Sequence, residues 1–349
     1  MKLKRKDSSS PQTQIAVLSE NVTEDKFERL VDAVNTPFSM LMAKADVIQS
    51  KCTDIDDVLM SDLKLNDKLH LSLSNSDEDI GITPYAFGQL CTKLGIPTQY
   101  MKKCIETGFS PLVTHSVNEW LNYFGHKKLL IRKYGDVSRG ILSDRYSICD
   151  TPEILSAISQ SGILDNMDLS SYIINPSRFH ARFVGDKMKI VGEDLFAGIQ
   201  IDSSDVGRSK LDIKFLVYKQ VCTNGLVLPK EAGTVYEQKH VGIEPTKMIE
   251  TLKESFNSFS TKVTDATSLI HKAKEIRIDD TESIFGMVKN GTKVGEEAVN
   301  DIFNVAYEHY DMSVWGIVNA ITEVSQKYTL EHRIVMERYA GILLTQLTK

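Results

Sequence analysis

The sequence predicts an α+β fold in which a largely antiparallel central sheet lies between an N-terminal helical region and a C-terminal helical region. Before about residue 125, apolar residues recur every three to four positions, and between about 126 and 244 they alternate with polar residues. The helical spacing returns after residue 245. Neighbouring strand candidates joined by short turns favour antiparallel pairing. With 349 residues, 42% of them hydrophobic, the chain is long enough to bury a core without disulfides or metals.

These patterns divide the chain into four regions. Residues 1–23 are expected to be a disordered tail, 24–125 a mainly helical region, 126–244 an antiparallel sheet region with one helix, and 245–349 a helical region. The clearest helix of the second region is Pro84–Leu94, because Thr83 can cap it and Gly95 ends it. No long linker interrupts residues 24–349, so we expect them to form one continuous body.

The middle region carries most of the strand signals. Strands are predicted at 128–134, 137–142, 172–184, 195–201 and 211–222, with a last one at 238–243. A turn at Gly135 and Asp136 joins the first two strands. A helix is predicted from Thr151 to the stop at Gly162. Asn224 and Gly225 predict a further tight turn.

A long helix over residues 248–273 opens the third region. Its apolar positions are Met248, Leu252, Phe256, Phe259, Val263, Ala266, Ile270 and Ala273. Their spacing, alternating between three and four after the first two steps, is that of a heptad seam, which needs a partner helix. We therefore expect a homo-oligomer formed through this helix. Further helices are predicted at 296–309, 313–327 and 330–347.

Composition excludes several classes of protein. The formal net charge of −6 argues against a protein that coats duplex DNA through its overall field. Five cysteines are scattered along the chain without the paired spacing of a disulfide framework or a zinc site: Cys52, Cys91, Cys104, Cys149 and Cys222. We expect free, buried thiols in a cytoplasmic protein. No apolar run reaches the length of a membrane span, and no membrane association is expected.

The sequence lacks a recognisable catalytic constellation. Its eight histidines stand alone, without the spacing of a metal site. The segment from Gly286 to Lys293 resembles a phosphate-binding loop, but it lacks the Gly-Lys-Ser/Thr order that such loops require. We therefore expect no enzymatic activity, no cofactor and no metal.

Basic residues gather on the predicted strands, and they define the candidate site. Arg178, His180 and Arg182 alternate with apolar neighbours, which places them on one strand face. The candidate nucleic-acid-binding residues are Lys128, Arg132, Lys133, Arg139, Arg145, Arg178, Arg182, Lys210 and Lys214, with Tyr134 and Tyr218 available for base stacking. Such a set is typical of a groove for single-stranded nucleic acid. It is equally typical of an ordinary solvated face, because exposed strands are often rich in Lys and Arg.

Some residues near this set have competing interpretations. Arg139 and Arg145 either form an ion pair with Asp144 or contact a phosphate together. Asp205 and Gly207 predict a turn between strands. For Cys222 we expect a small buried side chain rather than a reactive thiol, because no base is implied beside it.

Several segments resemble a known family. They are 130–146 (LIRKYGDVSRGILSDRY), 201–211 (IDSSDVGRSKL), 218–226 (YKQVCTNGL), 315–322 (WGIVNAIT) and 337–341 (ERYAG). Together they resemble the phage/plasmid-like proteins of domain-of-unknown-function family 932, from about Ile82 to the C-terminus. One departure is Asp202, where the family pattern has Asn. The resemblance implies a mobile genetic element in a bacterial host, and it brings no catalytic residues.

Two functions are consistent with these sequence observations. The first is non-catalytic binding of single-stranded nucleic acid in mobile-element DNA metabolism, for annealing or protection. The alternative is a protein-interaction or anti-defence assembly factor that binds no nucleic acid, which the acidic charge and the missing catalytic motif fit equally well. A continuous basic groove would favour the first, whereas a large exposed apolar patch would favour the second.

Overall fold

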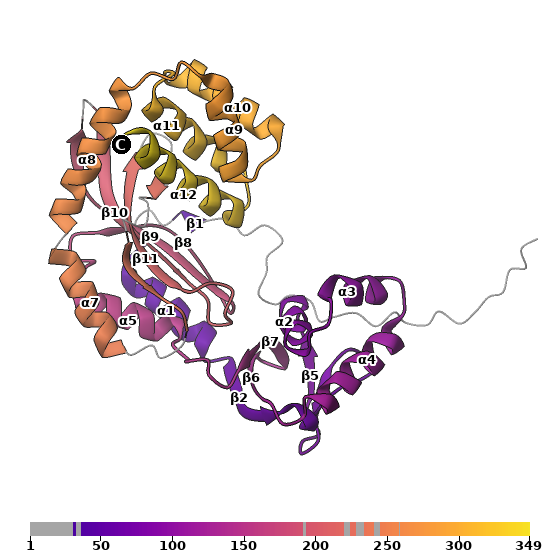
Figure 1. Cartoon of the computed structure of the whole chain (residues 1–349). Coiled ribbons are helices and arrows are strands. Elements are labelled where there is room, and N and C mark those ends of the chain that lie inside the picture. The colour runs from indigo at the N-terminus through magenta and orange to yellow at the C-terminus, as the bar shows by residue number, and fades with distance from the viewer. Residues whose placement is uncertain are drawn as a thin grey trace, which may run out of the picture. The chain divides into compact units, whose positions relative to one another are not determined.

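The computed structural model describes residues 31–32, 36–190, 193–219, 224–227, 234–240, 245–257 and 259–349. The predicted α+β class is confirmed (Figure 1). The described chain divides into two compact units rather than the single body that we expected. Unit 1 contains residues 52–144, and unit 2 contains the described residues before 52 together with those from 145 to 349. The tail predicted at 1–23 lies outside the described residues.

Unit 1 combines a six-stranded sheet with helices. Its elements are β2 (Cys52–Leu59), η1 (Met60–Asp62), β3 (Leu63–Leu65), β4 (Leu71–Leu73), β5 (Asp79–Ile82), α2 (Pro84–Leu94), α3 (Thr98–Glu106), α4 (Ser110–Tyr123), β6 (Lys128–Tyr134) and β7 (Val137–Ser143). Among the described residues the strand order is β2-β6-β7-β5-β4-β3, with β5 and β7 parallel and the other pairs antiparallel.

Local signals explain the parts of unit 1 that the sequence predicted. The hydroxyl of Thr83 accepts a hydrogen bond from the amide of Ala86 at the start of α2. Gly95 ends the same helix with a φ of 69°. Gly135 has a φ of 56° in the turn between β6 and β7. The boundary between the units falls after Asp144, not after residue 125, because this hairpin pairs with β2 and β5 and so belongs to unit 1.

The segment 52–82 departs from the mainly helical pattern that we expected for residues 24–125. It consists mostly of strands, and three of them have only three or four residues. Strands this short show little alternation in the sequence. The core of unit 1 forms where apolar residues of these strands meet the helices, for example Leu71, Phe87 and Ile131.

Unit 2 is built on a long antiparallel sheet. Its strands are β1 (Val31–Asp32), β8 (Asp168–Asn175), β9 (Arg178–Ile190), β10 (Glu193–Ser203), β11 (Leu211–Lys219), β12 (Asn224–Val227) and β13 (Thr234–Gln238). Among the described residues their order is β1-β8-β9-β10-β11-β12, and β13 also pairs with β11. All of these pairs are antiparallel.

Two strand predictions in this sheet were wrong in detail. The single strand predicted at 172–184 is a hairpin, because the side chain of Asn175 accepts hydrogen bonds from the amides of Ser177 and Arg178 and so stabilises a turn. The turn predicted at Asn224 and Gly225 is also wrong. Both residues lie within β12, opposite Lys219 and Tyr218 of β11.

The helices of unit 2 are α1 (Phe38–Gln49), α5 (Thr151–Ser161), α7 (Pro245–Asn257), α8 (Phe259–Glu275), α9 (Thr281–Thr292), α10 (Glu296–His309), α11 (Val314–Ser325) and α12 (Leu330–Leu347). One face of the sheet packs against α1, α5 and α7 (Figure 1). On this face, the ring of Phe183 in β9 meets the ring of Phe38 in α1 edge to face, with centroids 5.8 Å apart. The region from 286 to 293 lies mostly in α9, so it is not a phosphate-binding loop.

The seam predicted at 248–273 is shared between two helices, α7 and α8. Its described side chains Met248, Leu252, Ala266, Ile270 and Ala273 are all buried in the core of unit 2. This burial within the chain removes the reason to expect a partner helix at these positions. The side chains of Phe256, Phe259 and Val263, also assigned to the seam, lie outside the described set.

Three cysteines have the expected surroundings. Cys91, Cys104 and Cys149 are buried, and Cys52 is half-buried. Burial raises the pKa of Cys91 to about 11 and that of Cys149 to about 12, so both stay protonated thiols at neutral pH. Cys222 lies outside the described residues.

Two features are absent from the described residues. No described helix combines the length and the apolar character that are needed to cross a lipid bilayer. No three His, Cys, Asp or Glu side chains within the described ranges are grouped so that they could hold a metal ion.

Two glycines give opposite predictions for the same substitution. A Cβ at Gly198, at the irregular register between β9 and β10, would overlap the carbonyl oxygen of Phe183. A Cβ at Gly286, inside α9, would meet no atom within 4 Å. We expect Gly198→Ala to lower the free energy of unfolding by about 1–3 kcal/mol. Gly286→Ala should raise it by about 0.5–1 kcal/mol.

Urea denaturation of both variants and the wild type measures these changes. A Gly198→Ala variant as stable as the wild type would show that β9 and β10 are not held at this spacing.

A buried polar sheet face and an exposed aromatic cluster

The second face of the unit 2 sheet carries polar side chains in two neighbouring rows. In one row Asp202 of β10 stands between His180 of β9 and Asp212 of β11. In the next row Gln200 of β10 stands between Arg182 and Lys214. All are buried except Asp202, which is nearly so. A charged group at such a position has to be paired or hydrogen-bonded.

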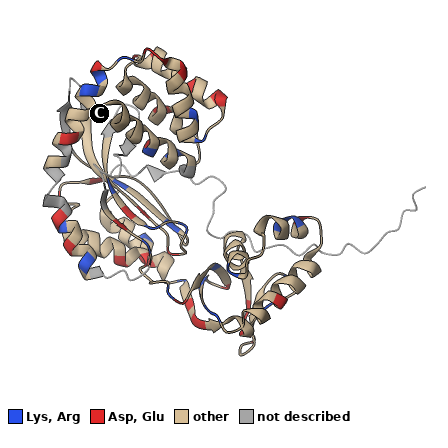
Figure 2. Cartoon of the chain, in the orientation of Figure 1, with Lys and Arg blue, Asp and Glu red and all other residues tan. Residues whose placement is uncertain are grey.

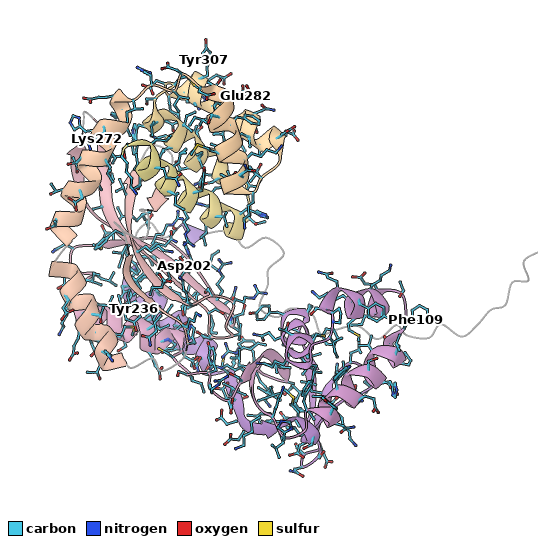
Figure 3. All side chains as sticks on the ribbon, in the orientation of Figure 1. Phe109, Asp202, Tyr236, Lys272, Glu282 and Tyr307 are labelled. Carbon is cyan, nitrogen blue, oxygen red and sulfur yellow. The ribbon has the colours of Figure 1, made fainter. Side chains whose placement is uncertain are left out.

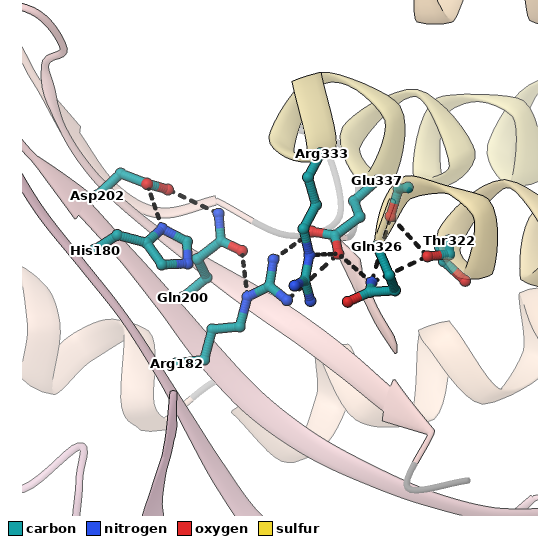
Figure 4. A network of polar contacts seen from close by, with 9 residues as sticks. His180, Arg182, Gln200, Asp202, Thr322, Gln326, Arg333 and Glu337 are labelled. Atoms are coloured by element: carbon teal, nitrogen blue, oxygen red, sulfur yellow. Dashed lines mark hydrogen bonds and ion pairs between the residues drawn. The ribbon is translucent and has the colours of Figure 1, made fainter. Parts of the chain in front are cut away.

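His180, Asp202, Gln200 and Arg182 form a continuous network that reaches α12 (Figure 4). His180 Nδ1 lies 2.6 Å from Asp202 Oδ1, and Gln200 Nε2 donates to Asp202 Oδ2 at 2.7 Å. Gln200 Oε1 accepts from Arg182 Nε at 3.2 Å. The guanidinium of Arg182 then pairs with the carboxylate of Glu337 in α12. The network thus connects the sheet to the C-terminal helix.

Two side chains outside the sheet also bind the carboxylate of Glu337. Arg333 Nε donates to Glu337 Oε1 at 2.8 Å, one helical turn away along α12. The side-chain amide of Gln326 donates to the same oxygen at 3.4 Å. Because Glu337 is fully buried, these partners and Arg182 replace the water that its carboxylate loses on folding.

The protonation states follow from burial and pairing. Burial lowers the pKa of His180 below its usual range, against the opposing effect of Asp202, so the imidazole is neutral at neutral pH. Burial alone would raise the pKa of Asp202, but His180, Gln200 and Lys214 together hold it well below its usual range. Asp202 is therefore ionised. It accepts the Nδ1 proton of a neutral His180, which leaves Nε2 as a bare acceptor.

The structure buries most of the cations that the sequence assigned to nucleic acid. Arg132, Lys133, Arg139, Arg182 and Lys214 are all buried. The expectation that they lie on a solvated strand face is wrong, because both faces of each sheet are partly covered by the fold. Period-two alternation separates the two faces of a strand, but it does not reveal whether the polar face meets water.

Internal carboxylates neutralise several of these cations. The pairs are Arg132 with Asp54, Lys133 with Glu78, Arg182 with Glu337, Lys210 with Glu237 and Lys214 with Asp212. The Arg132 pair uses two hydrogen bonds, of 2.9 Å and 3.2 Å, between β6 and β2. Cations paired in this way stabilise the fold, and binding a ligand would require them to leave their carboxylate partners. Figure 2 shows basic and acidic segments interspersed along both units.

The remaining candidates are more accessible but scattered. Lys128 is exposed and pairs with Asp57 at 3.0 Å, and Arg145 is exposed. Arg178 and Tyr134 are half-buried, and the side chain of Tyr218 lies outside the described set. The eleven candidates are also divided between the two units, with Lys128, Arg132, Lys133, Tyr134 and Arg139 in unit 1 and the others in unit 2.

Other residues singled out in the sequence have structural positions. The turn between β10 and β11 is confirmed, since Gly207 has a φ of 76° there. Asp205 is buried and accepts a hydrogen bond from the hydroxyl of Thr151 at 3.2 Å. Arg139 is buried in β7, whereas Asp144 is exposed, at the end of unit 1.

Unit 1 carries an accessible feature that the sequence reasoning missed. Trp120, Tyr123 and Phe124, at the end of α4, together with Lys127 after it, form what we call the aromatic cluster. The ring centroids lie 5.5 Å apart for Trp120–Tyr123, 5.8 Å for Trp120–Phe124 and 5.0 Å for Tyr123–Phe124. Tyr123 is 72% exposed and Trp120 43% exposed. Lys127 Nζ lies 3.8 Å from the centroid of the Phe124 ring.

The sequence of α4 signals only part of this cluster. Val113, Val117 and Leu121 repeat every four residues and are fully buried. Tyr123 falls outside that stripe, whereas Trp120, seven positions after Val113, lies at its edge and is still 43% exposed.

Comparison with known proteins adds no relative. No family model, no curated protein and no solved structure matches the chain. The resemblance to family 932 therefore stays a prediction from the sequence.

Two basic residues of β6 allow a matched test of the buried ion pairs. Arg132 and Lys128 each pair with an aspartate of β2, but only the Arg132 side chain is fully buried. We expect Arg132→Met to lower the free energy of unfolding by about 3–5 kcal/mol, because Asp54 loses its partner. Lys128→Met should change it by less than about 1 kcal/mol. Urea denaturation of the two variants measures the difference, and equal effects would contradict the structural role of Arg132.

Proposed function

We propose that the protein binds single-stranded nucleic acid without catalysing a reaction, and that the aromatic cluster is its stacking surface. The observation that carries this proposal is the exposure of two aromatic rings, Trp120 and Tyr123, beside a lysine. Sites for unpaired strands combine such rings with cations, because every base has a face that can stack.

The geometry of the cluster supports stacking in particular. Trp120 and Phe124 are inclined by only 21° to one another, whereas Tyr123 stands edge-on to both. The rings therefore support one another and lose little side-chain freedom when a base is added. Lys127 and Lys128 follow the rings after two intervening residues and supply positive charge for a backbone phosphate. Lys128 also pairs with Asp57, but this pair is exposed, so a phosphate can replace the carboxylate at little cost.

The small number of cations predicts a preference for unpaired strands. Duplex DNA hides its base faces and offers mainly phosphates, which meet a protein with a net charge of −6. Two phosphate contacts, at Lys127 and Lys128, give a log–log salt slope of about −1.4 for a single strand. The affinity would thus depend more on stacking than on charge.

The wider role rests on the sequence resemblance. A non-catalytic protein that covers unpaired strands suits annealing or protection during phage or plasmid DNA metabolism, in the cytoplasm of a bacterial host. A homo-oligomer would extend the number of stacking surfaces along one strand.

A stacking surface predicts a large effect of two substitutions. We expect Trp120→Ala and Tyr123→Ala each to weaken the binding of a labelled single-stranded oligonucleotide by about 5- to 150-fold, which corresponds to about 1–3 kcal/mol per stacked base. Fluorescence anisotropy at low salt measures the affinity. Tyr307→Ala is the matched control, because Tyr307 is 80% exposed and projects from α10 in unit 2 (Figure 3).

Tryptophan fluorescence gives an independent readout. The chain has two tryptophans, and Trp315 is buried, so quenching by added nucleic acid reports on Trp120. Binding without quenching would place the ligand elsewhere. No binding at about 50 mM salt, a concentration at which phosphate contacts are strong, or equal binding by the Trp120→Ala variant, would contradict the proposal.

One observation favours the alternative function, the binding of a protein partner. Tyr100 of α3, Phe109 between the helices and Leu112 of α4 are also exposed. The ring of Phe109 projects away from unit 1 (Figure 3). Exposed apolar side chains of this kind are typical of protein interfaces. Failure of the nucleic-acid experiment would make this interpretation the first choice.

A further inference from the structure

The network between the sheet and α12 contains one atom whose hydrogen-bonding capacity is unused. His180 is completely buried, and its Nε2 has no hydrogen-bond partner among the described residues. Its other ring nitrogen is held by Asp202 at 2.6 Å. A bare ring nitrogen inside a protein is a site where one proton can bind, and the surrounding groups determine how the structure responds to that proton.

The groups that face His180 come from several elements. Asp202 of β10 attracts a proton to the ring, whereas Arg178 and Arg182 of β9 repel it. On β8 the opposite residue is the apolar Ile173. Beyond Asp202 the row continues to Asp212 of β11, which is paired with Lys214. From α12, Arg333 and Glu337 reach the far side of Arg182.

We propose that this network is a proton-operated latch, in which uptake of one proton at His180 Nε2 loosens the hold of the sheet on α12. The proton comes from solvent and binds the lone pair of Nε2, and no other bond is made or broken. The ring then carries a charge and a second N–H donor, for which the described residues supply no hydrogen-bond acceptor. A buried donor left in this state is costly, so the network has to rearrange.

Gln200 transmits the change. Its amide lies between His180 and Arg182 (Figure 4), and its oxygen already accepts from Arg182 Nε. An oxygen that turns toward the new N–H of His180 abandons Arg182. The added charge also repels the guanidinium. Arg182 is the link from the sheet to Glu337 in this network, so its displacement weakens the contact with α12.

The direction of the pH dependence is set by the pKa of His180. Burial lowers this pKa below its usual value of 6.5. The opened form therefore binds a proton at a higher pH than the closed form does. The stability that neutral His180 contributes is complete above about pH 6.5 and is lost as the pH falls below that value. One linked proton raises the opening equilibrium of α12 by at most about tenfold per pH unit.

Amide hydrogen exchange of the full chain, corrected for intrinsic exchange rates, tests the latch. Between about pH 7 and pH 5 we expect the opening of α12 in the wild type to increase by up to about 25-fold. His180→Asn keeps a donor toward Asp202 but cannot take up a proton, so the increase should disappear. His309→Asn, at an exposed histidine paired with Glu323, is the matched control and should retain the wild-type increase.

Two further measurements keep the test decisive if His180→Asn does not fold. Asp202→Asn removes the charge that attracts the proton in the closed form, so the increase in opening should continue to a lower pH than in the wild type. Nitrogen-15 NMR of labelled histidines in the wild type should show that His180 of the closed form is still neutral, with its proton on Nδ1, below pH 6.5, because the proton is taken up by the opened form. An unchanged pH dependence in His180→Asn, or a His180 that is already charged in the closed form at pH 6.5, would overturn the proposal.

Discussion

Arg182 carries a permanent positive charge at a position that water does not reach, and the C-terminal half of the protein is organised around that constraint. A buried guanidinium requires a carboxylate and further acceptors. Glu337 supplies the carboxylate and Gln200 one more acceptor. Because Glu337 sits on α12, the requirement fixes which face of this helix meets the sheet. The apolar packing of α12, through residues such as Met336 and Leu343, then has one register in which both needs are met.

The need to pair every buried charge also explains why most of the basic residues are not available to a ligand. A cation that an internal carboxylate neutralises contributes little field outside the protein, and removing it to serve a ligand would leave the carboxylate buried and unpaired. Arg132, with Asp54, and Arg182, with Glu337, illustrate this in the two units. The ligand surface that we propose lies elsewhere, on a helix whose core stripe is satisfied by other residues. The rings of Trp120 and Tyr123 are exposed there, while Phe124 packs against the core of unit 1.

The sequence predicted the elements whose signals are local. The cap at Thr83, the left-handed glycines at 95 and 162, and the turn at Gly135 each act within a few residues, and the structure has them where they were expected. Burial of the polar strand faces could not be predicted, because it depends on α12, more than 150 positions along the chain from Arg182. The division into two units was missed for a related reason. The β6–β7 hairpin has strong strand signals, but no local feature shows that its partners are β2 and β5 rather than β8 to β11.

The central claim is that Arg182 and Glu337 depend on one another, and a double-mutant cycle measures this dependence directly. The variants are Arg182→Met, Glu337→Met and the double variant, compared by the free energy of unfolding in urea at neutral pH. The account predicts that the double variant is less destabilised than the sum of the single variants by about 1–3 kcal/mol, because neither side chain is then left charged without the other. Single-variant effects that add to within about 0.5 kcal/mol would contradict it.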